Sequence, residues 1–301
     1  MPSPPVFESM SFILVASHLP ITLARLIEQH KLYTRILSDR LIFPPISFSE
    51  NDEVLDIGTG AGKLIPLFPK TPASIAPTMS PGAWLCDART HLPESVQLYG
   101  IDIESRLFPA YATTSANVHL SICSATALPS YWSSKFALVH QRLLIFGYTR
   151  DQWRRTIDEM YRVLVPGGYA QLIEIGPEWV SGPKTATHIL FLDELLGNKG
   201  MLLRCGVYIA DMLKAAGFVD VKFEEVAMKL GKWAGEDGVQ GRDTTIGAWR
   251  GTRDSVMRMD AMGRFASAEE FDKAMDEVSA EWDNVEGSHA AVRVFYGRKP
   301  L

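Results

Sequence analysis

The chain of 301 residues has few cysteines, no basic run and no long apolar run. Its three cysteines, Cys86, Cys123 and Cys205, lie far apart, so the sequence predicts neither a disulfide framework nor a metal site. They fit a reducing compartment, and we expect a cytoplasmic protein. A formal net charge of −5 argues against nucleic acid as a partner, because neutralising phosphates requires a basic face.

The longest apolar patch near the start of the chain is Phe12-Ile13-Leu14-Val15. It is too short to span a membrane, and it lacks the basic flank of a signal peptide. We interpret residues 1–20 as an arm that docks on the fold, and we expect no membrane partner. The length is ample for a buried core.

What the chain does contain is a glycine turn directly after a short apolar run. Val54-Leu55-Asp56-Ile57 leads into Gly58-Thr59-Gly60-Ala61-Gly62. Glycine has no Cβ and tolerates positive φ, so the backbone here can pass close to a nucleoside or amino-acid ligand. A dinucleotide fold usually shows Gly-x-Gly-x-x-Gly with its acidic residue downstream, which disfavours an NAD-dependent dehydrogenase. The spacing instead resembles motif I of class I S-adenosylmethionine (SAM)-dependent methyltransferases.

Further apolar strands alternate with helical segments along the chain. Strands are predicted at 96–102, 118–122, 136–140, 169–175, 219–227 and 291–296, and a helix with the capping box Thr149-x-x-Gln152 is predicted at 149–164. This alternation predicts a doubly wound α/β sheet, whose ligand lies beyond the carboxyl ends of the strands. Asp102 ends a strand and suits a ribose. The glycine-rich segment 231–247 is expected to be a loop.

Several longer motifs match one family over most of the chain. They are Arg25-Leu26-x-x-Gln29-His30, the glycine turn, Gly100 to Pro109, Leu128-Pro129-x-x-Trp132, Val139 to Leu144, Tyr161 to Glu174, and Leu230 to Gly235. Together they resemble the fungal small-molecule methyltransferases of secondary-metabolite clusters, the umta-like group.

The resemblance implies a Rossmann-like, seven-stranded sheet with helices on both faces and a helical cover. Residues 46–176 would form the SAM-binding core, 1–45 an arm and lid helix, and 177–301 the substrate cover with the last two strands. The implied cofactor residues are Asp56, Gly58, Thr59, Gly60, Gly62, Asp102, Ile103, Ser124, Ala125, Thr126 and Arg25. Asp102 would hold the ribose, Ile103 would pack on the adenine, and Arg25 would meet the methionine carboxylate.

The segment Lys63 to Pro81 departs from the family pattern, in which the third glycine leads almost directly into a helix. That helix is instead indicated at Ala83 to Ala88, about twenty positions downstream. The segment is either a genuine proline-rich loop or a retained intron. Gly62-Lys63-Leu64 can encode a GTAAG donor and Pro81-Gly82 an AG acceptor, and excision keeps the frame, joining Ala61, one glycine and Ala83. Sequencing the transcript across this joint distinguishes the two.

Methyl transfer is an in-line displacement in which positioning and water exclusion do most of the work. A base is needed only for a protonated acceptor such as a phenol or enol. His140, expected to end its strand at the rim of the site, is the first candidate, and His188 in the cover is the second. Either could instead be structural. A pocket of Trp179, Phe191, Met201, Trp233 and Trp249 is predicted to suit an aromatic or polyketide-like acceptor.

The predicted function is therefore SAM-dependent methylation, by default at oxygen, of a small secondary metabolite by a monomer or homodimer. Two alternatives remain open. One is a methyltransferase-like regulator of secondary metabolism, which the absence of a basic import cluster disfavours. The other is a SAM-binding protein with a different reaction, such as a pericyclase.

Overall fold

The computed structural model describes residues 19–60, 62–65, 78–103 and 116–301, so most of the predicted arm lies outside the described residues. The strands are β1 Glu53–Ile57, β2 Gly62–Ile65, β3 Thr78–Gly82, β4 Gln97–Asp102, β5 Val118–Ile122, β6 Phe136–Arg142, β7 Leu164–Val180, β8 Val219–Lys229 and β9 His289–Arg298. The α-helices are α1 Leu19–Ile36, α2 Ala83–His91, α3 Arg150–Val163, α4 Pro183–Gly197, α5 Ile209–Ala215, α6 Gly235–Arg250, α7 Arg253–Arg258 and α8 Ala268–Asn284.

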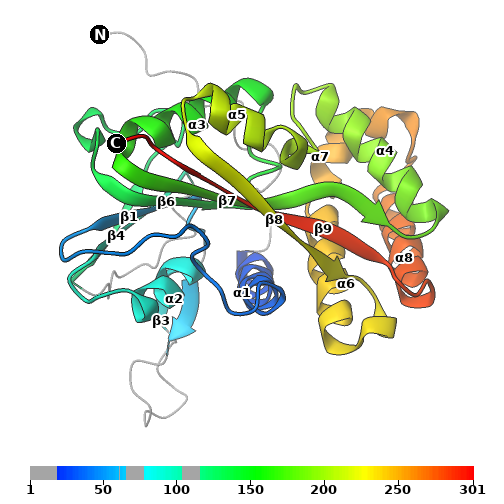
Figure 1. Ribbon diagram of the computed structural model, residues 1–301. Coiled ribbons are helices and arrows are strands. Elements are labelled where there is room, and N and C mark those ends of the chain that lie inside the picture. Colours follow the sequence, from blue (N-terminus) through cyan, green and yellow to red (C-terminus); the bar gives the residue numbers. More distant parts are fainter. Residues whose placement is uncertain (1–18, 61, 66–77, 104–115) are drawn as a thin grey trace.

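Seven of these strands form one twisted sheet in the order β5-β4-β1-β6-β7-β9-β8. Strands β5, β4, β1, β6 and β7 run parallel, and β9 lies antiparallel between β7 and β8. Helices α1 and α2 cover one face, and α3 and α5 cover the other (Figure 1). The predicted α/β fold, a seven-stranded Rossmann-like sheet with helices on both faces, is confirmed.

The long strands β7 and β9 continue past the parallel part of the sheet toward the helices α4, α6 and α8 (Figure 1). Beyond the sheet, α6 and α8 pack against each other, and α4 packs against α8. These helices form a cover at one end of the molecule, and β7 links that cover to the parallel strands.

The core has a layer on each face of the sheet, as the alternation of strand side chains requires. Trp84 and Leu85 of α2 pack with Val54 on one face. On the other face, Trp153 of α3 packs in a larger cluster that includes Leu55. Val54 and Leu55 are consecutive residues of β1, so the strand that leads into the glycine turn is packed against helices on both faces of the sheet.

The predicted capping box is present at the start of α3. The backbone N–H of Gln152 donates to Thr149 Oγ1 at 3.3 Å, and the backbone N–H of Thr149 donates to Gln152 Oε1 at 2.9 Å. These two bonds satisfy backbone donors that the first turn of a helix leaves unpaired. They account for the helix beginning where the sequence predicts.

The loop predicted for 231–247 is wrong, because α6 occupies most of that segment. A Cβ on Gly238 would collide with the carbonyl oxygen of Gly231, and one on Gly241 with that of Lys229. The glycines therefore permit close backbone contact between this helix and its neighbours, rather than breaking the helix.

The segment that departs from the family pattern has two described ends, residues 62–65 and 78–82, and these pair with each other. Strands β2 and β3 form a two-stranded antiparallel ladder in which Gly62 faces Gly82. Residues 66–77 lie outside the described residues, so the choice between loop and intron stays open. Helix α2 begins at Ala83, as predicted.

None of the helices in the described ranges is long and apolar enough to cross a membrane.

Candidate active site

The glycine turn follows β1 at the carboxyl edge of the sheet. Gly58 and Gly60 have φ of +68° and +58°, a region that L side chains rarely adopt. The Thr59 N–H donates to the Ile101 carbonyl at 2.9 Å, and the Gly60 N–H donates to Asp102 Oδ2 at 3.0 Å. The turn is therefore bound to the end of β4, the neighbouring strand.

Space and chemistry at this edge suit a nucleoside. Among the described residues, a Cβ built on Gly60 would meet only the Gly58 carbonyl oxygen, at 3.7 Å, so this glycine is not crowded by them. Beside the Asp102 carboxylate, the Ile103 side chain is 43% exposed although it is apolar. An acceptor for hydroxyl groups next to an accessible apolar side chain matches a ribose followed by a flat base. Since the cofactor residues predicted here meet at one edge, the site fits SAM.

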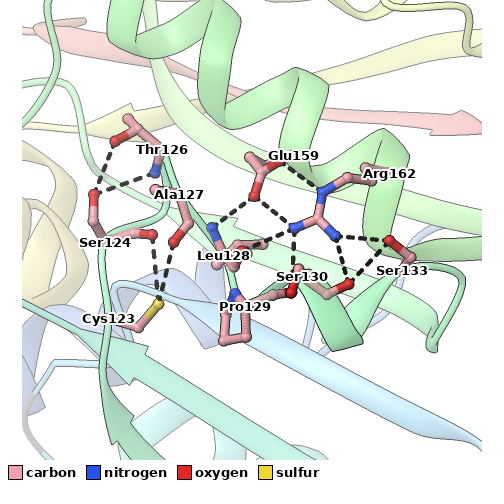
Figure 2. Close-up of polar contacts among 10 residues, drawn as sticks. All are labelled: Cys123, Ser124, Thr126, Ala127, Leu128, Pro129, Ser130, Ser133, Glu159 and Arg162. Carbon is pink, nitrogen blue, oxygen red and sulfur yellow. Dashed lines mark hydrogen bonds and ion pairs between the residues drawn. The ribbon is translucent and has the colours of Figure 1, made fainter.

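The segment Ser124 to Thr126 follows β5 at the same edge. The N–H of Cys123 donates to the Asp102 carbonyl at 3.1 Å, which places the segment next to the end of β4. Ser124 Oγ and Thr126 Oγ1 are 2.9 Å apart and hydrogen-bond to each other (Figure 2). Ala125 between them is buried. The sequence placed these three residues near the adenine, and the structure brings them beside Asp102.

An ion pair that the sequence reading did not single out anchors the continuation of this segment. Arg162 of α3 binds both oxygens of Glu159, at 2.8 and 2.7 Å, and also donates to the Leu128 carbonyl at 3.0 Å and to Ser133 Oγ at 2.9 Å (Figure 2). Glu159 in turn accepts from the Leu128 N–H at 2.6 Å. The hydrogen bond from Arg162 lowers the pKa of Glu159, although burial opposes it. Arg162 is one of the family-matching positions, which was the available signal.

Asp56 is buried beneath the glycine turn. Burial raises the pKa of its carboxyl group to about 7, while the hydroxyl of Thr59 and the guanidinium of Arg142 act in the opposite direction. Of the other predicted cofactor residues, Gly62 lies in β2, apart from the turn.

His140 does not end its strand, so its predicted place at the rim is wrong. Strand β6 continues to Arg142, and the His140 ring is fully buried. It stacks on Trp84 at 3.9 Å between ring centroids, and its Nδ1 accepts from Gln171 Nε2 at 3.1 Å. Burial lowers the pKa of His140 well below its ordinary value, helped by Arg142, so the ring is neutral.

His188 lies in α4 among aromatic rings of the cover. Its ring is 4.5 Å from that of Trp249, and burial lowers its pKa to about 3. Trp179 joins the same cluster at 5.2 Å from Trp249. The cluster thus unites part of the predicted pocket. No ring contact within the described residues connects it to Trp233, which lies before α6 and donates to the Leu230 carbonyl.

Arg25 lies on the side of α1 that faces α6. Its side-chain Cδ would be 3.2 Å from a Cβ built on Gly247. Burial lowers the pKa of Arg25. Its guanidinium makes no ion pair with any side chain that the structure describes, and its contact with the methionine carboxylate of SAM stays a prediction.

Glu174 of β7 is a further buried acid that the sequence reading did not single out. It is fully buried, and Oε1 accepts from the Leu144 N–H at 2.8 Å. A Cβ on Gly58 would come within 2.8 Å of Leu144 Cδ2, so Leu144 packs on the glycine turn. Burial raises the pKa of Glu174 to about 8, opposed by the backbone N–H groups of Leu144 and Ile145. Glu174 thus fixes the loop that supports the turn from below.

The described residues contain no group of three or more His, Cys, Asp or Glu side chains that could hold a metal ion. The charged groups of the site are instead arranged singly around the glycine turn.

Comparisons with known proteins identify the family of this chain. A family described as a methyltransferase domain matches residues 78–168. N-methyltransferase verN of Clonostachys rogersoniana is 31% identical over 210 residues, covering 68% of this chain and 69% of verN. N-methyltransferase sirN of Leptosphaeria maculans is 27% identical over 292 residues, covering 92% of this chain and 91% of sirN.

Among solved structures, phosphoethanolamine N-methyltransferase 2 of Haemonchus contortus, bound to phosphomonomethylethanolamine and S-adenosylhomocysteine, has the same fold. The TM-score is 0.56 at 16% identity. The match covers all of this chain but 62% of that one, less than two thirds of its length.

This chain belongs to the class I SAM-dependent methyltransferases, in the group of fungal secondary-metabolite enzymes. It is a methyltransferase whose cofactor is SAM. Methyl transfer thus takes precedence over the regulatory and non-methylating alternatives.

Proposed function

We propose that this enzyme transfers the methyl group of SAM to a nitrogen atom of a small secondary metabolite. The sequence alone favoured oxygen. Four relatives between 24% and 31% identical are named N-methyltransferases, which supports nitrogen instead. Bound SAM supplies an electrophilic methyl group, and a neutral nitrogen lone pair can attack it directly.

The observation that carries the cofactor part of the proposal is the hydrogen bond from the glycine turn to Asp102. It fixes a carboxylate and an open turn at the carboxyl edge of adjacent strands, where class I folds bind their ligand. In this proposal Asp102 binds the ribose hydroxyls, and Ile103 with Ser124 to Thr126 receives the adenine. Gly58 to Gly60 let the backbone approach the cofactor.

Both candidate histidines are buried, and burial lowers the pKa of each, which makes them weak bases out of reach of solvent. We infer that neither removes a proton from the acceptor. Their roles in this proposal are structural: His140 supports Trp84 under the sheet, and His188 supports the aromatic cluster. Trp179, the partly buried member of that cluster, is then available to contact a flat acceptor beside the cover of α4, α6 and α8. Catalysis would rest on orientation and water exclusion.

The test is transfer of a labelled methyl group from SAM to a panel of small acceptors bearing amine, amide, phenol or carboxyl groups. We expect a mass increase of one methyl group, with a nuclear magnetic resonance signal of an N-methyl product. The Asp102→Ala variant should lose transfer because it loses cofactor affinity. Products methylated at oxygen alone would overturn the assignment to nitrogen.

A further inference from the structure

Arg142 is the last residue of β6, at the carboxyl edge that also carries the glycine turn. Residues Asp56 and His140 face each other in the register of β1 and β6. Because side chains alternate along a strand, Arg142 points to the same face as both. The guanidinium therefore lies beyond the ends of the two central strands, and its charge interacts with Asp56.

A chain of hydrogen bonds between three elements fixes this guanidinium. Its NH2 group donates to His30 Nδ1 of α1 at 3.1 Å, so the ring proton lies on Nε2. That nitrogen is 2.7 Å from Asp87 Oδ2 of α2 and donates to it. Tyr33, one turn along α1, places its ring 5.7 Å below the guanidinium carbon. The hydrogen bond to His30 and the ring of Tyr33 hold the Arg142 side chain, and the other N–H groups of its guanidinium are not used in these contacts.

In the part of the chain that the structure describes, no carboxylate is bonded directly to the guanidinium of Arg142. Within the described residues, its one hydrogen bond goes to the His30 ring. Asp87 binds His30, and Asp56 interacts with Arg142 through its charge, without a hydrogen bond. A half-buried arginine fixed in place, with donors to spare, is suited to bind a carboxylate in two places.

The direction of the cofactor follows from the strand order. Asp102 ends β4, and Ser124 to Thr126 follow β5, which lies on the outer side of β4. With the ribose over β4 and the adenine over β5, the amino-acid part must extend the other way, over β1 and β6. There it meets Asp56 and Arg142, one acidic and one basic group, which complement an amino group and a carboxylate.

We propose that Arg142 binds the carboxylate of the methionine part of SAM, and that His30, held by Asp87, positions the guanidinium. This inference rests on the proposed SAM site. It assigns to the end of β6 the role that the family resemblance suggested for Arg25. Arg142 is thus a binding residue, whereas His30 acts through it.

The experiment compares two ligands by isothermal titration. S-adenosylhomocysteine carries the carboxylate, whereas 5′-methylthioadenosine shares the nucleoside and sulfur but lacks the amino-acid group. We expect S-adenosylhomocysteine to bind to Arg142→Gln roughly 10- to 100-fold more weakly than to the wild type, because the charge-assisted hydrogen bonds are lost. Binding to Arg142→Lys should be several-fold weaker, because the charge remains but the paired donors do not. Affinity for 5′-methylthioadenosine should stay within about twofold, since these bonds are absent from its complex.

His30→Leu should reduce the affinity ratio of the two ligands by a smaller factor than Arg142→Gln, because the arginine is still present. Arg154→Gln, at an exposed ion pair with Asp151, is the matched control. An unchanged ratio in both Arg142 variants would overturn the proposal, as would a ratio that falls only in Arg25→Gln. Failure of the wild-type chain to bind either ligand would instead contradict the SAM site itself. Thermal unfolding of each variant confirms that it is folded.

Discussion

At the scale of single residues, Gly58 combines a positive φ with crowding by Leu144. In Gly58→Ala we expect the left-handed backbone to cost about 1–2 kcal/mol of unfolding free energy, with a further loss if Leu144 cannot move. Urea denaturation measures this. Gly200→Ala is the matched control, because Gly200 has nearly the same φ, +69°, and no atom of the described residues lies within 4 Å of its Cβ position. Equal losses in the two variants would mean that contact with Leu144 has no energetic effect.

The buried carboxyl group of Glu174 leads to a prediction about how the stability of the protein depends on pH. Its pKa in the folded protein is about 8, above the ordinary value of 4.5, so the folded state binds the proton more tightly than the unfolded state. The contribution of Glu174 to stability is therefore complete below about pH 4.5 and is lost as the pH rises toward 8. Glu174→Gln, which cannot ionise, should remove this part of the decline.

Urea denaturation of wild type and Glu174→Gln at pH 5 and pH 9 tests this expectation. The wild type should lose more stability than the variant between the two values. Glu178→Gln, at an exposed position on the same strand, controls for the substitution itself. Parallel losses in wild type and Glu174→Gln would show that the carboxyl group is not protonated in the folded protein.

At the scale of secondary-structure elements, Arg162 connects α3 to the loop after β5. Arg162→Gln removes its charge-assisted bonds to Glu159 and to the carbonyls of residues 128–130. We expect amide hydrogen exchange in residues 127–133 to accelerate roughly tenfold or more, because local opening becomes easier. Mass spectrometry of exchange measures this, with Arg154→Gln on the same helix as the control. Unchanged exchange would show that the loop is held by packing alone.

Local patterns predicted most of the elements correctly. Helix α3 has its capping box within four residues, and β5 has the bounds that its apolar run predicts. Helix α6 was missed because its glycines contact Lys229 and Gly231, outside the helix, and no pattern within the segment reports such contacts.

Local patterns also predicted part of the candidate site. The glycine turn and Asp102 follow from motif spacing, since each sits at the end of an apolar strand. The Asp87–His30–Arg142 chain could not be found this way, because its bonds join residues 57 and 112 positions apart. His140 was misplaced because the strand continues through the polar residues Gln141 and Arg142, where an apolar pattern stops.

At the scale of the whole molecule, the paired ends of the β2–β3 ladder make an excision testable. Gly62 and Gly82 are partners, so their Cα atoms are about 5 Å apart, close to the spacing of consecutive residues. A chain in which Gly62 is joined to Ala83 loses the β2–β3 ladder but should keep the seven-stranded sheet, with Gly62 in the position that precedes α2. We expect the melting temperature to change by less than about 5 °C.

Circular dichroism and isothermal titration with S-adenosylhomocysteine compare the shortened chain with the full one. Binding as tight as in the full chain, or tighter, is expected. An unfolded or non-binding shortened chain would show that the segment is an integral part of the cofactor site.

The length of β7 has a consequence for how the two ends of the molecule can move. One strand carries Glu174, below the glycine turn, and Trp179, within the aromatic cover. Its pairing with β9 shifts register between Ile175 and Trp179, so the ladder is irregular between the cofactor end and the cover. Because a bulge bends a strand and interrupts its ladder, a relative movement of the two ends would bend β7 and β9 together at this point.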